Sequence, residues 1–95
     1  MKLTPTLGEN RYGGAQPQIE VRSTKDIKPR AFRACLHTLA ARAELESPAQ
    51  ERWFVQIEVV SDVLGYLYLE LMDGTPAEAE RGVAFLKAIV GGQGA

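Results

Sequence analysis

Alternating apolar and polar residues mark two stretches in the middle of the chain. The first covers residues 52–60, and its expected core-facing residues are Trp53, Val55, Ile57 and Val59. The second covers residues 66–72, and its expected core-facing residues are Leu67, Leu69 and Leu71. A period of two is typical of a β-strand with one buried face. Because only a short loop around residues 62–65 joins the two stretches, we predict an antiparallel hairpin.

The pattern in residues 1–23 is weaker. Ile19 and Val21 alternate with Glu20 and Arg22, which predicts a short, half-buried strand over residues 18–23. Residues 1–17 are rich in proline, glycine and asparagine. We therefore expect an irregular N-terminal arm over residues 1–17, with at most one short strand near Leu3.

A helical period follows this first strand. Pro29 suits the first position of a helix, because its missing N–H would be unpaired there in any case. The expected buried stripe consists of Phe32, Cys35, Leu36, Leu39 and Ala43. Pro48 restricts the residue before it and cannot continue the hydrogen-bond ladder, so we predict that the helix ends near Glu46.

The start of a second helix is well defined. Thr75 is the expected N-cap, Pro76 the first helical residue and Glu78 the reciprocal partner in a capping box. The expected buried stripe consists of Ala79, Val83, Leu86 and Val90, with Ile89 beside it. The pair Gly91 and Gly92 predicts a left-handed stop, which leaves residues 92–95 as a flexible tail.

The order of these elements, β-α-β-β-α, predicts an α+β domain over residues 18–91. A right-handed crossover after the first strand places both helices on one face of an antiparallel sheet. This arrangement is ferredoxin-like, with the usual final strand missing. The sheet edge that the missing strand leaves free would be able to pair with a strand of a partner.

Composition is that of an ordinary globular domain. The chain has 95 residues, enough for one core, with 45% hydrophobic residues and a formal net charge of −1. This balance provides no general attraction to nucleic acid or to anionic membranes. Cys35 is the only cysteine, and we recognise neither a secretory signal nor a membrane span. We therefore expect a cytoplasmic protein.

The sequence contains no pattern that indicates catalysis. Cys35 and His37 are two residues apart on a helix, about 200° around its axis, so they cannot form a nucleophile–base pair. His37 is the only histidine and has no second ligand at metal-binding spacing. We expect a protein that is not an enzyme and that needs no metal or cofactor.

The face of the sheet without helices is the first candidate site. Its expected partner-binding residues are Phe54, Glu58, Tyr66, Tyr68, Glu70 and Met72. Exposed aromatics on an open sheet can stack on RNA bases, but the neighbouring glutamates would repel a phosphate backbone. Aromatics and methionine suit a protein interface better. The alternative is that the N-terminal arm folds across this face, because the aromatic residues have no evident partner within the hairpin.

A basic cluster is the second candidate site. It surrounds the junction between the first strand and the first helix and consists of Arg22, Lys25, Lys28, Arg30 and Arg33. Near a helix N-terminus, such a cluster could bind a small anion. The alternative is a basic edge that is simply solvated, as most charge runs are.

Part of the sequence resembles the NIL and ACT domains. The resemblance is carried by residues 65–71, by the acidic helix start at residues 75–80 and by residues 83–86, with a looser match at residues 19–21 and Pro29. It covers about residues 18–90. NIL and ACT domains are small ferredoxin-like regulatory domains, and NIL domains occur on methionine-transporter ATPases and as short separate proteins. The resemblance implies side-by-side dimerisation and binding of an amino acid or another small ligand at an interface.

Together these observations predict a non-enzymatic regulatory or protein-binding module. The expected partner is another protein or a second copy of the chain, in a homodimer. One alternative is a domain that senses a small ligand, either an amino acid or an anion. A further alternative is an accessory subunit of a larger enzyme. We expect no interaction with nucleic acid or membranes.

Overall fold

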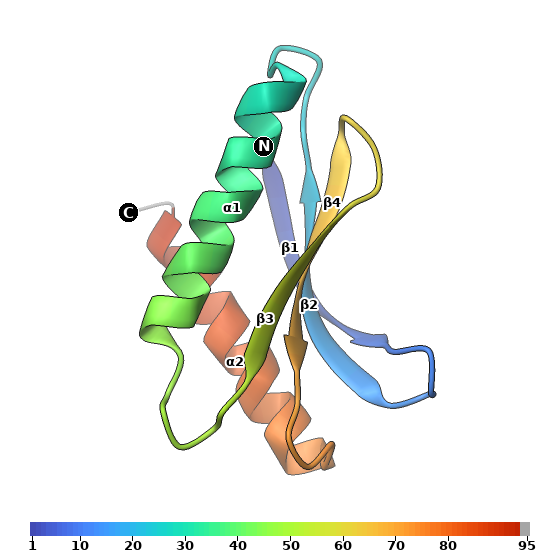
Figure 1. Ribbon diagram of the computed structural model, residues 1–95, viewed down its shortest axis with the longest axis vertical. Coiled ribbons are helices and arrows are strands. Elements are labelled where there is room, and N and C mark those ends of the chain that lie inside the picture. Colours follow the sequence, from blue (N-terminus) through green and yellow to red (C-terminus); the bar gives the residue numbers. More distant parts are fainter. Residues whose placement is uncertain (94–95) are drawn as a thin grey trace.

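A four-stranded antiparallel sheet and two helices form the two layers of the molecule (Figure 1). The computed structural model describes residues 1–93. The elements are β1 (Lys2–Glu9), β2 (Ala15–Arg22), α1 (Pro29–Glu46), β3 (Phe54–Val59), β4 (Leu64–Glu70) and α2 (Pro76–Gln93). No helix within residues 1–93 is both long enough and apolar enough to cross a bilayer.

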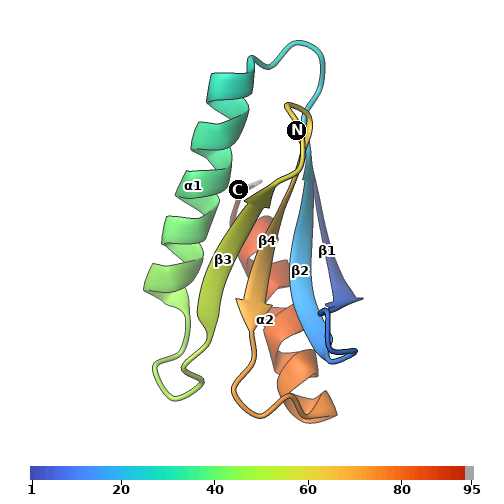
Figure 2. The same ribbon diagram turned by 45° about the vertical axis from the view of Figure 1, so that its right-hand side comes forward.

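The strands lie in the order β1-β2-β4-β3, and every neighbouring pair is antiparallel (Figure 2). Because β2 and β3 both run antiparallel to β4, they are parallel to each other with β4 between them. Helix α1 makes the crossover that connects them. The predicted hairpin is confirmed, since β3 pairs with β4 from Phe54↔Glu70 to Val59↔Gly65.

The prediction of an irregular arm over residues 1–17 is wrong. Strand β1 pairs with β2 along its whole length, from Lys2↔Arg22 to Glu9↔Ala15. Consequently, the edge of β2 that we expected to be free is occupied, and the sheet has a fourth strand. Proline and glycine hid this strand from the sequence pattern, but both residues are tolerated on an edge strand, where few ladder hydrogen bonds are needed.

Both helices cover the same face of the sheet. The buried core joins odd-numbered strand residues such as Ile19 and Leu67 to α1 through Leu36 and to α2 through Leu86. Helix α1 contacts β3 and β4, whereas α2 contacts β1 and β2. The predicted core positions Trp53, Leu67 and Leu69 are buried, but Val59 is 41% exposed, because β3 is an edge strand.

The boundaries of α1 agree with the prediction, including its end at Glu46. Its buried residues are Phe32, Leu36, Leu39 and Ala43, while Cys35 is half-buried and His37 is exposed. Cys35 thus lies on the flank of the buried stripe.

The predicted stop of the second helix is wrong. Helix α2 continues through Gly91 and Gly92 to Gln93, and neither glycine adopts a left-handed conformation. Glycine costs a helix less in its last turn, where few further hydrogen bonds depend on it. Residues 92–93 of the predicted tail are therefore helical, and residues 94–95 lie outside the described part of the chain.

Candidate interaction surface on the helix-free face

The even-numbered residues of the strands form the face of the sheet opposite the helices. The strand registers arrange them in rows that cross all four strands. One row is Thr4, Glu20, Tyr66 and Glu58, and the next is Thr6, Gln18, Tyr68 and Gln56. This face is therefore lined by hydroxyl, amide, carboxylate and phenol groups.

The two tyrosines at the centre of this face contact each other and two glutamates. The rings of Tyr66 and Tyr68 stack with centroids 5.7 Å apart. The Tyr68 hydroxyl donates to Glu58 Oε1 at 2.6 Å, and the Tyr66 hydroxyl donates to Glu20 Oε1 at 3.3 Å. The expectation that these aromatics have no internal partner is wrong for the tyrosines, because the hairpin register and β2 bring carboxylates beside them.

The environment of Tyr68 keeps its phenol protonated. Desolvation raises the pKa of Tyr68, and the hydrogen bond to Glu58 and the negative charge of Glu58 raise it further. A phenol with a raised pKa is a donor near neutral pH and not a base. A carboxylate can accept several hydrogen bonds, so Glu58 can hold Tyr68 and still receive a donor from a ligand.

A groove of about 680 Å³ lies on this face, between the sheet and the β1–β2 loop. The end of the β1–β2 hairpin bends away from the helices (Figure 1). The strand side chains that line the groove are Gln16, Gln18, Gln56, Glu58, Tyr68 and Glu70. The loop contributes Asn10, Arg11 and Tyr12.

The loop beside the groove is held in shape by one side chain. Asn10 Oδ1 accepts hydrogen bonds from the backbone N–H groups of Tyr12 and Gly14, both at 2.9 Å. This asparagine turn leaves the Tyr12 side chain 87% exposed at the edge of the groove. The loop therefore adds an aromatic contact that is ordered by the backbone and is not covered by the rest of the domain.

The charge of the groove is negative. Its lining includes the carboxylates of Glu9, Glu58 and Glu70 and a single guanidinium, that of Arg11. Carboxylates that share one groove attract cationic groups and disfavour anionic ones. The groove is therefore better suited to lysine or arginine side chains than to phosphate.

Phe54 and Met72 extend this surface toward the start of β3. Phe54 pairs with Glu70 across the hairpin and is 63% exposed, and Met72 lies two residues beyond Glu70 and is 52% exposed. All six residues predicted to bind a partner thus come from one hairpin, but only Tyr68, Glu58 and Glu70 line the groove. Phe54 and Met72 provide exposed apolar contact area beside it.

The residues of the predicted basic cluster lie in different layers. Arg22 is on the sheet, where its guanidinium forms an ion pair with Glu20 at 2.9 Å. Arg33 is on α1 and forms an ion pair with Asp62 at 3.2 Å. Lys25, Lys28 and Arg30 are exposed near the start of α1. Two of the five cations therefore already have carboxylate partners in the folded chain.

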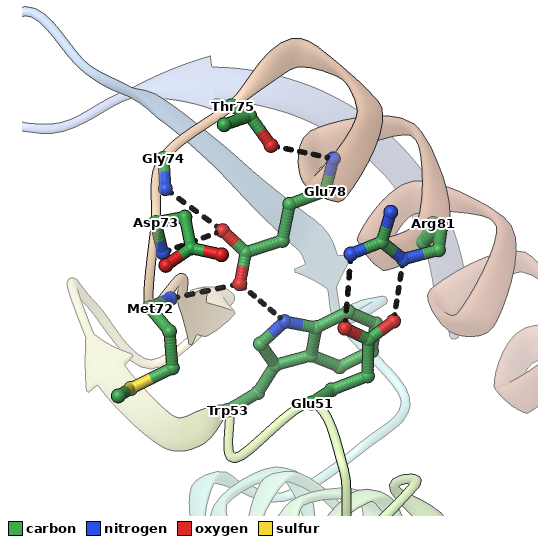
Figure 3. A network of polar contacts seen from close by, with 8 residues as sticks. All are labelled: Glu51, Trp53, Met72, Asp73, Gly74, Thr75, Glu78 and Arg81. Atoms are coloured by element: carbon green, nitrogen blue, oxygen red, sulfur yellow. Dashed lines mark hydrogen bonds and ion pairs between the residues drawn. The ribbon is translucent and has the colours of Figure 1, made fainter.

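A second polar network surrounds the buried carboxylate of Glu78, which is 1% exposed (Figure 3). Its Oε1 accepts from the N–H groups of Asp73 and Gly74, and its Oε2 accepts from the N–H of Met72, all at 2.8 Å. The Trp53 indole donates to the same Oε2 at 3.1 Å. Four donors thus converge on one carboxylate.

This network confirms only half of the predicted capping box. Thr75 Oγ1 accepts from the N–H of Glu78 at 3.2 Å, as a cap should. The Glu78 side chain does not bond the N–H of Thr75. It accepts instead from the N–H groups of the three residues before Thr75. Gly74 has a φ of 70°, a left-handed conformation that glycine adopts without strain, and this bend directs those N–H groups at the carboxylate.

The network has a structural role. Burial disfavours the charged form of Glu78, but the hydrogen bonds from Met72, Gly74, Asp73 and Trp53 outweigh it and lower the pKa of Glu78. Beside it, Arg81 makes two hydrogen bonds to Glu51, at 2.6 and 3.1 Å. An ionised carboxylate with both oxygens occupied cannot act as a general base. It joins α2 to the start of β3.

Sequence analysis missed the contribution of β1, β2 and their loop to the groove. Gln16 and Gln18 continue the alternation of Glu20 and Arg22 toward the N-terminus, and this signal was present in the sequence. We overlooked it because Pro17 stands between the glutamines. The position of Tyr12 in the lining of the same groove as Tyr68 depends on the β1–β2 hairpin and had no sequence signal.

Comparison of the chain with protein-family models, with curated proteins and with solved structures found no match. The function is therefore inferred from the surface described above.

Proposed function

We propose that this protein is a non-enzymatic regulatory or protein-binding module, and that its helix-free face binds a basic segment of a partner protein. The groove would receive lysine or arginine side chains, and Tyr68 and the glutamines that line the groove would bond the backbone of the bound segment. Phe54, Met72 and Tyr12 would supply apolar contacts at its rim.

We also propose that the domain is a rearranged ferredoxin-like fold. The support comes from the parallel pair β2 and β3, which flank β4 and are joined by α1. In the ferredoxin-like order the outer position beside the first of these strands is filled by a final strand. Here β1 lies in that position, although it comes first in the chain. This relation would also account for the weak resemblance to NIL and ACT domains.

One observation carries the functional proposal: three carboxylates and one guanidinium line the same open groove. Other carboxylates form ion pairs with guanidinium groups, as Glu51 does with Arg81 and Glu46 does with Arg42. Glu58 instead accepts only a neutral phenol among the contacts described for it, and so keeps its full charge facing the groove. Aromatic residues and methionine are enriched in protein interfaces, and the charges of two partners are arranged to complement each other.

A selection from a random-peptide phage library tests the proposal. We expect the purified domain to enrich peptides that contain lysine or arginine, with binding that weakens as salt rises. In the double variant Glu58→Gln/Glu70→Gln, the affinity for an enriched peptide should fall about tenfold, because two charge-assisted hydrogen bonds are weakened. Fluorescence polarisation with the labelled peptide measures this change.

The matched control is Glu44→Gln/Glu80→Gln, which removes the same charge from exposed positions on α1 and α2. It should leave the affinity for the peptide unchanged. Enriched peptides without cations, or an equal loss of affinity in the two double variants, would contradict the proposal.

A further inference from the structure

The two edges of the sheet differ in their protection against pairing. Edge strands of soluble proteins commonly carry lysine, proline or other features that prevent another strand from adding to them. Strand β1 has Lys2, Pro5 and Gly8. Strand β3, Phe54–Val59, has none of these residue types, and Glu58 is its only charged residue. The β3 edge is therefore the open one.

The direction of the β3 backbone groups follows from its pairing with β4. The N–H of Val60 donates to the carbonyl of Leu64 at 3.0 Å, one position beyond the pair Val59↔Gly65. Hydrogen-bonded and non-hydrogen-bonded pairs alternate along an antiparallel ladder. The N–H and C=O groups of Val55, Ile57 and Val59 consequently point to the open edge.

Apolar side chains are exposed along the same edge. Phe54 is 63% exposed, Val60 51% and Val59 41%. Phe54 and Val60 belong to the helix-free face and Val59 to the helix face, so both sides of the edge offer apolar surface. Exposed apolar residues that line an unpaired strand are the features of a strand-addition site.

We propose that β3 pairs with β3 of a second copy, antiparallel, with Ile57 opposite Ile57 of the second copy. This places Val55 opposite Val59 of the second copy as a hydrogen-bonded pair on the helix face. On the helix-free face, Phe54 lies opposite Val60 of the second copy and Gln56 opposite Glu58. The two sheets become one continuous sheet of two copies related by a twofold axis.

Other registers are less favourable. Side chains alternate along a strand. A shift by one residue would therefore place the helix face of one copy on the same side of the joined sheet as the helix-free face of the other copy. A register centred on Gln56 would place Phe54 against the carboxylate of Glu58. A register centred on Glu58 would place two like charges directly opposite each other, which is destabilising. Only the register centred on Ile57 pairs the exposed apolar residues and gives each Glu58 an amide donor.

The proposed dimer is small. Six residues of β3 form its centre, so the buried area lies at the low end for specific complexes, and we expect a dissociation constant in the micromolar range. The second copy must contribute the same strand, because hydrogen bonds, apolar pairs and Gln–Glu pairs all repeat across the twofold axis. A homodimer fits this edge better than an unrelated strand.

Sedimentation equilibrium over a range of concentrations measures the dimer. We expect the wild-type chain to dimerise and Val59→Lys to be monomeric, since the inserted charge would replace an apolar residue in both Val55–Val59 pairs. The matched control is Leu7→Lys, at a helix-face position on the opposite edge, β1, where Leu7 is 55% exposed against 41% for Val59. It should dimerise like the wild type. Circular dichroism confirms that both variants are folded.

Two further variants test the register without loss of apolar contact. Gln56→Lys would place a lysine opposite Glu58 of the second copy at two symmetric positions, and should tighten the dimer about tenfold. Gln56→Glu would oppose like charges and should weaken it about tenfold. The same substitutions at Thr6, an exposed residue of the same face on β1, should have no effect.

Three results would overturn the inference: a wild-type chain that is monomeric at millimolar concentration, a Val59→Lys variant that still dimerises, or Gln56→Lys and Gln56→Glu variants with the same dimer affinity. The test is separate from that of the proposed function. Val59 lies on the helix face, whereas Gln56 and Glu58 line the groove and also meet in the proposed dimer. Peptide binding is therefore measured below the dissociation constant of the dimer, where Val59→Lys should leave it unchanged.

Discussion

At the scale of single residues, Glu78 is the side chain whose substitution should reduce stability most. Its carboxylate accepts from three backbone N–H groups and from the Trp53 indole while almost fully buried. Glu78→Gln replaces one acceptor by an NH₂ group that faces donors. Because buried donors would lose their partners, we expect the free energy of unfolding to fall by about 3 kcal/mol. Urea denaturation followed by Trp53 fluorescence measures the loss.

The same residue predicts how stability depends on pH. The folded-state pKa of Glu78 is lowered from its ordinary value of 4.5, so its contribution is fully present above that value. The contribution is lost as the pH falls through the lower, folded-state pKa. As the pH falls below 4.5, the wild type should therefore lose more stability than Glu78→Gln. Glu80→Gln, an exposed neighbour on α2, is the control and should follow the wild type.

At the scale of elements, the stability of the fold depends on the close approach of α2 to β2. Gly82 is buried, and a Cβ atom built there would lie 2.7 Å from Cγ of Pro17. A proline ring cannot rotate away, so the helix would have to move from the sheet. We expect Gly82→Ala to lower the free energy of unfolding by about 2 kcal/mol. Thermal and urea denaturation provide the measurement.

A different glycine substitution in the same helix should raise the free energy of unfolding. A Cβ atom at Gly91 would have no heavy atom within 4 Å, and alanine favours a helix over glycine. Gly91→Ala should raise the free energy of unfolding by about 0.5 kcal/mol. If Gly82→Ala also raised stability, helix propensity alone would explain both variants, and the packing of α2 on Pro17 would not matter.

At the scale of the whole molecule, the position of β1 can be tested by moving it. The start of β1 and the last described turn of α2 lie toward the same end of the molecule (Figures 1 and 2). A chain that begins at Gly14 and carries residues 1–10 after Gln93, through a Gly/Ser linker of about eight residues, should therefore fold. It would have the strand connectivity of the ferredoxin-like fold.

The control for this permutation is the chain from Gly14 onward without residues 1–10. It leaves the edge of β2 unpaired and exposes part of α2, so we expect cooperative unfolding to be lost. Circular dichroism and the sharpness of urea denaturation separate the two chains. A truncated chain as stable as the wild type would show that β1 adds nothing to the fold.

Local sequence alone determined much of this protein: the β3–β4 hairpin, the core positions Leu67 and Leu69, both helix starts and the end of α1. These features depend on local spacing and on proline, whose geometry restricts the chain wherever it occurs. Periodicity also separated the two faces of the hairpin and so located half of the candidate surface, at Phe54, Glu58, Tyr66, Tyr68, Glu70 and Met72.

Tertiary structure decided the rest. Strand β1 exists because β2 offers it a paired edge, although Pro5 and Gly8 would weaken any isolated strand. Tyr66 gains the carboxylate of Glu20 as a partner, and the groove gains its loop, only when distant strands meet. Glu78 collects donors that come from two segments of the chain. Each of these features is a contact across the sheet or between layers, and the spacing of residues along one segment carries no information about such contacts.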